Sequence, residues 1–272
     1  MRLDGQVAIV TGGTRGLGRA IGLELARVGA DVVLTHRWGS ADEDELVAAF
    51  TDERLPAPWI VESDVADPDA TRALLESVRE RFGRLDVLVS NVAFAKVAEG
   101  LADLKRSSFE LSLRYSAWPV VDFVQASGEI FGAPPRRTIA ISSLGAEVCP
   151  EGYDLAGAAK ASLEMLCRYL ALRVQPHGAT VNVLRTGYLD TASARATFGD
   201  ETIDELGRRG MLMDPAVAAR ACVALASEWM AGVTGHVLHA DAGWSLRDPI
   251  HYVRPGGTKS SASAGVQKEQ SS

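Results

Sequence analysis

The sequence is poor in the features that would direct it to nucleic acid, to a membrane or to the secretory route. Its 272 residues carry 28 Lys and Arg against 35 Asp and Glu, so the formal net charge is −7, and no basic cluster offsets it. Nucleic-acid binding needs a basic face that displaces counterions, which excludes this class of partner. No apolar run reaches the roughly 20 residues that span a bilayer, and the N-terminus lacks a cleavable signal pattern. We therefore expect a soluble, cytoplasmic protein.

Cysteine is scarce as well. The three cysteines, Cys149, Cys167 and Cys222, are too widely spaced for a disulfide framework or a zinc site, so we expect a reducing compartment and no metal. There is no internal repeat and no second-domain boundary, and 47% of the residues are hydrophobic, so one domain is expected over residues 1–247. Residues 248–272 have almost nothing to bury, which predicts a flexible tail.

Apolar, β-branched runs alternate with amphipathic stretches along the chain. This order is typical of βαβ units, whose parallel strands are covered on both faces and are therefore apolar throughout. Seven such strands predict an α/β fold with one doubly wound parallel sheet of the Rossmann type and helices on both faces. One helix is expected at 42–53 and another from about Phe109 to Gly128, in which Pro119 predicts a kink or an early break.

The segment "TGGTRGLG", Thr11 to Gly18, follows the first strand and opens the first helix. Gly12, Gly16 and Gly18 allow a tight turn and let a pyrophosphate approach the free N–H groups at the helix start. A glycine cluster alone is weak evidence, but at the first βα turn of such a chain it predicts dinucleotide binding. The other loop residues expected to contact the cofactor are Thr14, Arg15 and Leu17.

The choice between the two nicotinamide cofactors is expected at the end of the second strand. An acidic residue there would bind the ribose 2′-hydroxyl of NAD, whereas a cation would accommodate the 2′-phosphate of NADP. The segment "LTHRWGS" contains His36 and Arg37 and no carboxylate before Asp42, and Arg15 is a second cation within plausible reach. These residues predict NADPH (NADP) as cofactor, although Arg37 also fits a solvated loop charge.

Together these motifs resemble the short-chain dehydrogenase/reductase family, over about Arg2 to Leu246. "TGGTRGLG" is similar to the family's cofactor loop, "ISS" at 141–143 to its active-site serine strand, and "DAG" at 241–243 to its closing turn. The resemblance implies further cofactor contacts within "SDV", "SNVA" and "RTGYLDT". These are Asp64 and Val65, then Asn91, then Gly187, Leu189 and Thr191.

Members of this family usually share a catalytic Ser, Tyr and Lys, with Tyr four residues before Lys. Here Lys160 is preceded at that distance by Ala156, and the tyrosine is Tyr153, seven before Lys160 and ten after Ser143. This spacing resembles the enoyl-thioester reductase branch. The resemblance implies that Tyr153, Lys160 and Ser143 are catalytic and that Lys160 also holds the nicotinamide ribose. The implied substrate is an α,β-unsaturated acyl thioester, carried on acyl carrier protein or coenzyme A.

The displaced tyrosine is consistent with that chemistry. On a helix, spacings of four and seven both keep two side chains on one face, but the axial distance grows from about 6 Å to about 10.5 Å. In enoyl reduction the hydride reaches the β-carbon, and charge collects on a thioester oxygen further from the nicotinamide. Stabilisation acts only where charge appears. We therefore expect Tyr153 to donate to this oxygen and the positive Lys160 to lower its pKa.

Two other functions stay open at this point. One is a carbonyl reductase whose Tyr153 reaches a ketone in a different substrate pose. The other is a non-catalytic NADP-binding relative, motivated by Ala156 and by Ser112, which stands near the place where the family commonly has a proton-relay Asn. Arg114 fits either a pocket-facing cation or an exposed helix residue.

Two larger features are also expected from the resemblance. Residues from about 188 to 213 should form a substrate lid. A homo-oligomer, most simply a tetramer, should form through helices such as the one in residues 153–174, whose apolar positions lie on more than one face.

Overall fold

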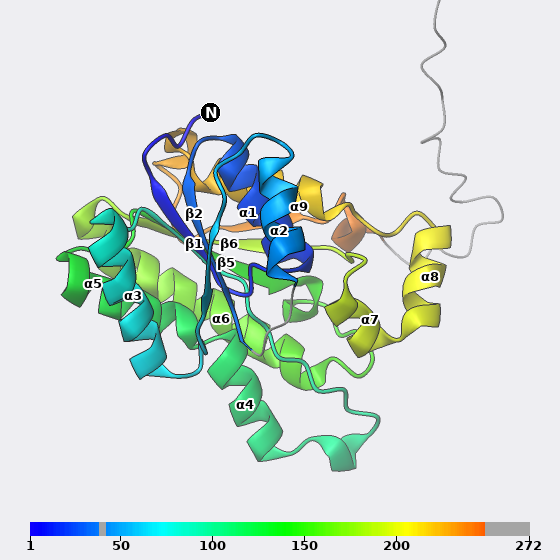
Figure 1. The fold of residues 1–272 in the computed structure, drawn as a ribbon. Helices are drawn as coiled ribbons and strands as arrows, with labels where there is room; N and C mark the ends of the chain where they lie inside the picture. Colours follow the sequence, from blue (N-terminus) through cyan, green and yellow to red (C-terminus); the bar gives the residue numbers. More distant parts are fainter. Residues whose placement is uncertain (38–41, 248–272) are drawn as a thin grey trace, which may run out of the picture.

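The computed structural model describes residues 1–37 and 42–247, so the predicted tail, 248–272, lies outside the described residues. In the described part, seven parallel strands form one sheet in the order β3-β2-β1-β4-β5-β6-β7 (Figure 1). The predicted doubly wound α/β fold is therefore confirmed. The strands are β1 (Val7–Val10), β2 (Asp31–His36), β3 (Trp59–Glu62), β4 (Val87–Ser90), β5 (Arg137–Ser143), β6 (Thr180–Thr186) and β7 (Val237–Ala240).

Helices connect the strands and cover both faces of the sheet (Figure 1). Those before β5 are α1 (Gly16–Arg27), α2 (Glu43–Thr51), α3 (Pro68–Phe82), α4 (Arg106–Ser116) and α5 (Pro119–Phe131). Those after β5 are α6 (Asp154–Val174), α7 (Ala192–Phe198), α8 (Asp200–Arg208) and α9 (Pro215–Ala226).

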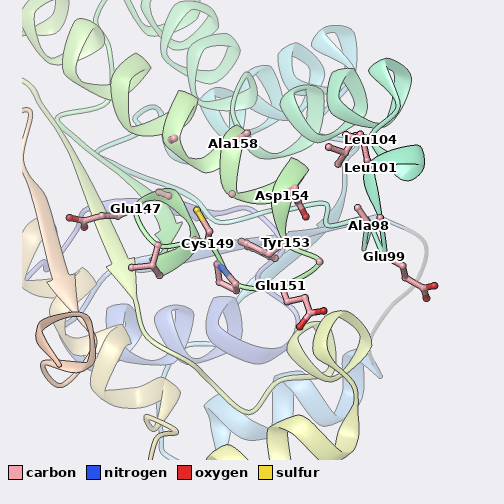
Figure 2. A pocket seen from close by; sticks show the side chains of 18 residues that line it. Ala98, Glu99, Leu101, Leu104, Glu147, Cys149, Glu151, Tyr153, Asp154 and Ala158 are labelled. Atoms are coloured by element: carbon pink, nitrogen blue, oxygen red, sulfur yellow. The ribbon is translucent and has the colours of Figure 1, made fainter. Parts of the chain in front are cut away.

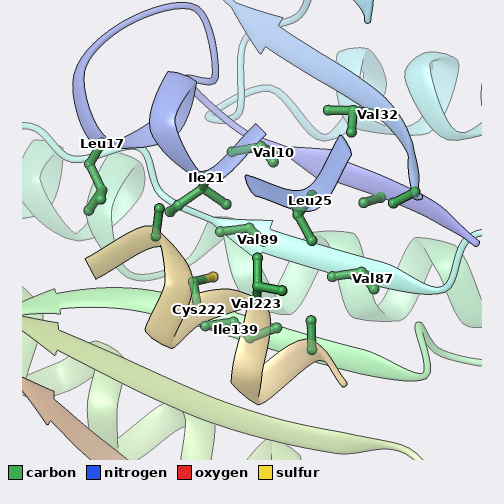
Figure 3. Packing of buried hydrophobic residues seen from close by; sticks show 14 of the residues in the cluster. Val10, Leu17, Ile21, Leu25, Val32, Val87, Val89, Ile139, Cys222 and Val223 are labelled. Carbon is green, nitrogen blue, oxygen red and sulfur yellow. The ribbon is translucent and has the colours of Figure 1, made fainter. Parts of the chain in front are cut away.

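The core has two layers because side chains alternate along each strand. Ala8 and Val10 of β1 pack with α1, α2 and α9 on one face, whereas Val7 and Ile9 pack with α3, α5 and α6 on the other. Figure 3 shows the first layer, where Leu25 of α1 and Val223 of α9 meet above the central strands. Both faces of the central strands β1 and β4 are buried, and their residues are apolar except for Ser90.

The helix predicted for 109–128 is broken where Pro119 indicates. Helix α4 ends at Ser116, and α5 begins at Pro119, its first helical residue. Proline has no N–H to continue the hydrogen-bond pattern of a helix, but it is well suited to a first turn. The chain changes direction between the two helices, and α4 extends to one end of the molecule (Figure 1).

The strand order reverses between β1 and β4, which places a crevice at the carboxyl ends of the strands. The loops that follow β1, β4, β5 and β6 therefore meet at one edge of the sheet. The segment after β6 forms α7 and α8 beside this edge and closes on itself, since Leu189 bridges Met213 and the Met213 N–H donates to the Tyr188 carbonyl at 2.9 Å.

Candidate active site

The glycine loop has the geometry that an anion needs. Gly12 and Gly16 have φ values of 61° and 54°, a region that favours glycine. A Cβ at Gly18 would overlap the carbonyl oxygen of Gly12. Helix α1 starts at Gly16, and its N-cap, the exposed Arg15, gives no side-chain capping bond. The N–H groups at this helix start are thus available to a pyrophosphate, which the loop fits.

Asn91, expected at the cofactor, supports the glycine loop. Its Nδ2 donates to the carbonyls of Thr11 and Gly12 at 2.9 and 3.2 Å, and its backbone N–H donates to Thr11 Oγ1 at 2.9 Å. Asn91 follows β4, so these bonds join the two strands that flank the crevice. Asn91 therefore supports cofactor binding indirectly, by holding the glycine loop in place.

At the far end of the crevice, Arg37 and Asp64 are brought together. Arg37 Nη1 lies 3.0 Å from Asp64 Oδ2, and its guanidinium lies over the ring of Tyr115, 5.4 Å from the centroid. The Tyr115 hydroxyl also hydrogen-bonds Arg37. His36 is separated from this group: it is buried, with Nε2 3.7 Å from Glu43 Oε1. Tyr115 comes from α4 and was not predicted.

Ser112 and Arg114 of α4, considered above as a proton-relay position and a pocket-facing cation, both make hydrogen bonds to backbone carbonyls. Ser112 is fully buried and donates to the Ser108 carbonyl of its own helix at 3.0 Å. Arg114 is exposed, and its Nε and Nη2 donate to the Ala66 carbonyl at 3.2 and 3.1 Å. The pocket-facing alternative for Arg114 is therefore wrong.

The three predicted catalytic residues converge at the end of β5. Lys160, on α6, is buried, and its Nζ donates to the Ile141 carbonyl at 2.7 Å. Burial lowers the pKa of this amine to about 8. Tyr153 is the N-cap of α6, so all six residues between Tyr153 and Lys160 are helical. The Ser143 side chain at the end of β5 lies close enough to the Tyr153 hydroxyl to lower its pKa.

The expected lowering of the Tyr153 pKa is not found. Burial raises the pKa of this phenol, Ser143 acts in the opposite direction through the hydrogen bond, and Tyr188 raises it further. A phenol with a raised pKa remains protonated at neutral pH and is a hydrogen-bond donor. Ala156, at the usual tyrosine position, is buried and contributes no polar group.

A cavity of about 690 Å³ opens beside Tyr153 (Figure 2). Its walls come from the segment after β4, the segment between β5 and α6, and the first turns of α6. The residues that line it are Ala98–Leu101, Leu104, Gly145–Asp154, Gly157, Ala158 and Ala161. Phe198 of α7 packs on Tyr153 with ring centroids 5.5 Å apart, and Tyr188 packs on Phe198 at 6.0 Å. The tyrosine is thus enclosed by an aromatic cluster from the segment after β6.

Two glycines form a seat for the Tyr153 ring that the sequence did not indicate. A Cβ at Gly145 would lie 2.5 Å from Tyr153 Cε1, and a Cβ at Gly157 would lie 2.5 Å from the Gly145 carbonyl oxygen. Neither glycine has a positive φ, so the constraint here is space. A Gly four residues after a Tyr in the segment "GYDLAGAAK" is the only signal available in the sequence.

The remaining predicted cofactor residues lie around the glycine loop or behind it. Thr191 begins α7 as its N-cap, accepting from the Ala194 N–H at 3.1 Å, and a Cβ at Gly16 would lie 3.3 Å from Thr191 Cγ2. Gly187 packs against Asp241, since its Cβ would lie 3.1 Å from the Asp241 Cα. Largely buried positions are Thr14, Leu17, Val65 and Leu189.

Residues 1–37 and 42–247 contain neither a metal-binding cluster nor a membrane-spanning helix. No group of three His, Cys, Asp or Glu side chains is placed there to hold a metal ion. No helix in these ranges combines the length and the apolar character needed to cross a bilayer.

Comparison with known proteins gives consistent results. Residues 12–245 match the family model described as enoyl-(acyl carrier protein) reductase. The 1-cyclohexenylcarbonyl-CoA reductase of Streptomyces collinus is 29% identical, over 92% of this chain and 91% of its own. The 3-oxoacyl-(acyl-carrier-protein) reductase of Escherichia coli is also 29% identical, over 89% and 98%. A short-chain dehydrogenase of Burkholderia cenocepacia, solved with NADP, superposes with a TM-score of 0.79 at 28% identity, covering 91% and 100%.

The family match covers most of the chain, and these relatives carry the names of reductases and a dehydrogenase. Their agreement with the glycine loop and with the Ser, Tyr and Lys cluster leaves one conclusion. The chain belongs to the short-chain dehydrogenase/reductase family and is an oxidoreductase.

Proposed function

We propose that the protein is an NADPH-dependent reductase that saturates the double bond of an α,β-unsaturated acyl thioester. The observation that carries this proposal is the place of the phenol. Tyr153 precedes α6, lies in the cavity wall and is close to Ser143, while the usual position, Ala156, is buried and apolar. The name of the Streptomyces relative, a reductase of a cyclohexenyl CoA thioester, supports the same reaction class.

The residues divide the work by position. Bound NADPH would supply the hydride for the β-carbon. Tyr153 donates a hydrogen bond to the thioester oxygen, where negative charge develops, and its raised pKa keeps the proton in place until then. Ser143 orients the phenol. Lys160 holds the ribose hydroxyls as an ammonium. Residues 188–213 form a lid, in which Phe198 and Tyr188 shield the Tyr153 hydroxyl from water.

NADPH is the proposed cofactor because of the cation at the end of β2. Arg37 has a guanidinium for the 2′-phosphate, and its contact with Asp64 can be exchanged for a stronger one with a dianion. The exposed Arg15, in the glycine loop after β1, is a second cation available to this phosphate. A lower Michaelis constant for NADH than for NADPH, unchanged in Arg37→Ala, would contradict this assignment.

Keto reduction is the second candidate, because the Escherichia coli 3-oxoacyl relative is as similar as the enoyl relative. The deciding assay mixes the enzyme with NADPH and either crotonyl-CoA or acetoacetyl-CoA, follows nicotinamide absorbance and identifies products by mass. We expect butyryl-CoA from crotonyl-CoA and at least a hundredfold loss of kcat in Tyr153→Phe, roughly the share of a positioned donor. Turnover of acetoacetyl-CoA alone would reject the enoyl assignment.

We also propose a homotetramer. Met165, Tyr169 and Leu172 form an exposed apolar row along α6, with exposed fractions of 47, 61 and 72%. Their spacing of four and three places them on one side of the helix, and Trp118 is also exposed, at 52%. Light scattering with size exclusion should give four chains, and Tyr169→Glu with Leu172→Glu should lower the mass without unfolding the chain.

A further inference from the structure

Arg185, near the end of β6, is a buried cation with partners on several elements. Its register neighbours in the sheet are Ser142 of β5 and His239 of β7. Its side chain is only 8% exposed, so its charge must be paired to be tolerated. The side chain of Glu164, on α6, is equally buried. Its Oε1 accepts a hydrogen bond from Arg185 Nε at 2.9 Å and its Oε2 accepts one from Arg185 Nη2 at 2.5 Å, which is the geometry of a bidentate pair.

The same guanidinium reaches the segment that carries Tyr153. Arg185 Nη1 forms an ion pair with a carboxylate oxygen of Glu147 and lies 3.1 Å from His239 Nε2. Glu147 lies between Ser143 and Tyr153 and is 59% exposed at its side chain. Figure 2 shows its side chain pointing away from Tyr153. It lines the cavity without approaching the phenol.

A short rigid path leads from Glu147 to the Tyr153 ring. The Glu147 N–H donates to the Leu144 carbonyl at 3.0 Å, which closes the 3-10 turn Leu144–Ala146. Gly145, in the middle of this turn, is the residue whose backbone contacts the Tyr153 ring. A shift of the turn therefore becomes a shift of the phenol. On the other side, Glu164 lies one helical turn after Lys160.

We infer that Glu147 and Arg185 are positioning residues. Their ion pair holds the turn under Tyr153, and the Arg185–Glu164 pair holds α6, so that phenol and Lys160 stay in register. The Ser142 hydroxyl, which donates to Glu164 Oε1 at 2.6 Å, completes the connection to β5. This inference rests on the proposed enoyl reduction for its kinetic test only.

Glu147→Gln in the full-length enzyme is the direct test. The substitution keeps the shape of the side chain and removes its charge, and the exposed position makes misfolding a minor concern. We expect kcat with NADPH and crotonyl-CoA to fall about tenfold, as mispositioning of a catalytic group does, with the Michaelis constant for NADPH and the Tm nearly unchanged.

Glu228→Gln is the matched control. Glu228 is also about half exposed, at 51%, and pairs at 3.3 Å with a buried arginine, Arg137, at the opposite end of β5. If breaking any such ion pair lowered activity by destabilising the whole protein, Glu147→Gln and Glu228→Gln would lose activity to the same extent. We expect the control to keep its kcat within about twofold, as a distant surface change does.

A second readout does not depend on the reaction. Amides in residues 144–153 should exchange with deuterium at least about threefold faster in Glu147→Gln than in the parent, whereas Glu228→Gln should leave them unchanged. In an Arg185→Lys background, Glu147→Gln should add little further effect, because the shared pair is already weakened. Should Arg185→Lys not fold, the single variants decide alone.

Unchanged exchange in Glu147→Gln would overturn the inference whatever the kinetics. A rise in the Michaelis constant for crotonyl-CoA, with kcat and exchange unchanged, would also overturn it by assigning Glu147 to substrate binding. If the parent enzyme does not reduce crotonyl-CoA, the proposed function fails, and the exchange experiment still tests the positioning role.

Discussion

At the scale of single residues, the position of the Tyr153 ring depends on glycines that have no side chain to displace it. The Tyr153 ring rests on Gly145, where any side chain would meet it. We expect Gly145→Ala to displace the phenol and to lower kcat by about a hundredfold, the effect of a shift near 1 Å in a catalytic group. The backbone there accepts alanine, because φ is not positive. NADPH affinity should be unchanged in a fluorescence titration, and a kcat like the parent's would mean that the ring does not rest there.

Lys160 gives the site a pH dependence. Burial lowers its pKa to about 8, so the ammonium that we propose binds the ribose is lost as pH rises through that value. We expect the NADPH dissociation constant to rise about fivefold between pH 7 and pH 9, the cost of one charged hydrogen bond. Tyr153→Phe should retain this dependence, and Lys160→Met should abolish it. A dependence that survives in Lys160→Met would assign the titration to another group.

The same shift has a consequence for stability with a definite sign. The folded pKa of Lys160, about 8, is below the ordinary value of 10.5, so the unfolded chain binds this proton more tightly. Through this group alone, the free energy of unfolding therefore rises between about pH 8 and pH 10.5. Activity and stability respond to alkaline pH in opposite directions.

Not all residues of the site were equally open to prediction. Ser143, Tyr153 and Lys160 lie within 18 positions of the sequence, on one strand end and one helix start, so a local motif sufficed to select them as candidates. The contact between Arg37 and Tyr115 was not predicted, because Tyr115 is 78 residues away in the sequence and lies on α4. Local patterns carry no information on such tertiary contacts.

At the scale of elements, the helices after β6 complete the site. Phe198 on α7 packs between Tyr153 and Tyr188, so its ring fixes the position of the tyrosine that we propose contacts the substrate. We expect Phe198→Ala to raise the Michaelis constant for crotonyl-CoA about fivefold, since one or two aromatic contacts are worth roughly 1 kcal/mol. The affinity for NADPH should not change. Phe131→Ala, at the end of α5, serves as a control for a lost aromatic ring on another element.

The elements themselves were largely predictable. The seven strands follow from apolar runs, and the break before α5 follows from Pro119, both of which are local signals. The helical geometry expected between Tyr153 and Lys160 is confirmed, because α6 begins at Asp154 and includes every residue between them. The Gly-rich and Pro-containing segment before it does not favour a further helical turn.

At the scale of the whole molecule, the cavity beside Tyr153 has a negatively charged wall. The cavity wall carries four carboxylates, those of Glu99, Glu147, Glu151 and Asp154, and no Lys or Arg. The segment 188–213 adds five acidic and three basic residues. A substrate with several phosphate groups is therefore repelled on approach, and salt screens this repulsion over about 8 Å.

The resulting prediction concerns ionic strength. At saturating NADPH, the Michaelis constant for crotonyl-CoA should fall about twofold as salt rises from about 20 to about 150 mM. The crotonyl thioester of N-acetylcysteamine has the same acyl group without phosphates, and its Michaelis constant should not change. A rise with salt for the CoA ester would mean that cations outside the cavity wall dominate its binding.

Tyr153 lies ahead of α6, whereas Lys160 lies within it, and this arrangement matters for evolution and for protein engineering. The acid is carried by a connecting segment and the amine by a packed helix, so the first can be relocated by insertion, deletion or substitution while the second keeps its place. One scaffold can thereby address electrophiles of different reach without a redesigned sheet. A library confined to residues 144–153 is the smallest in which to look for such changes of reaction.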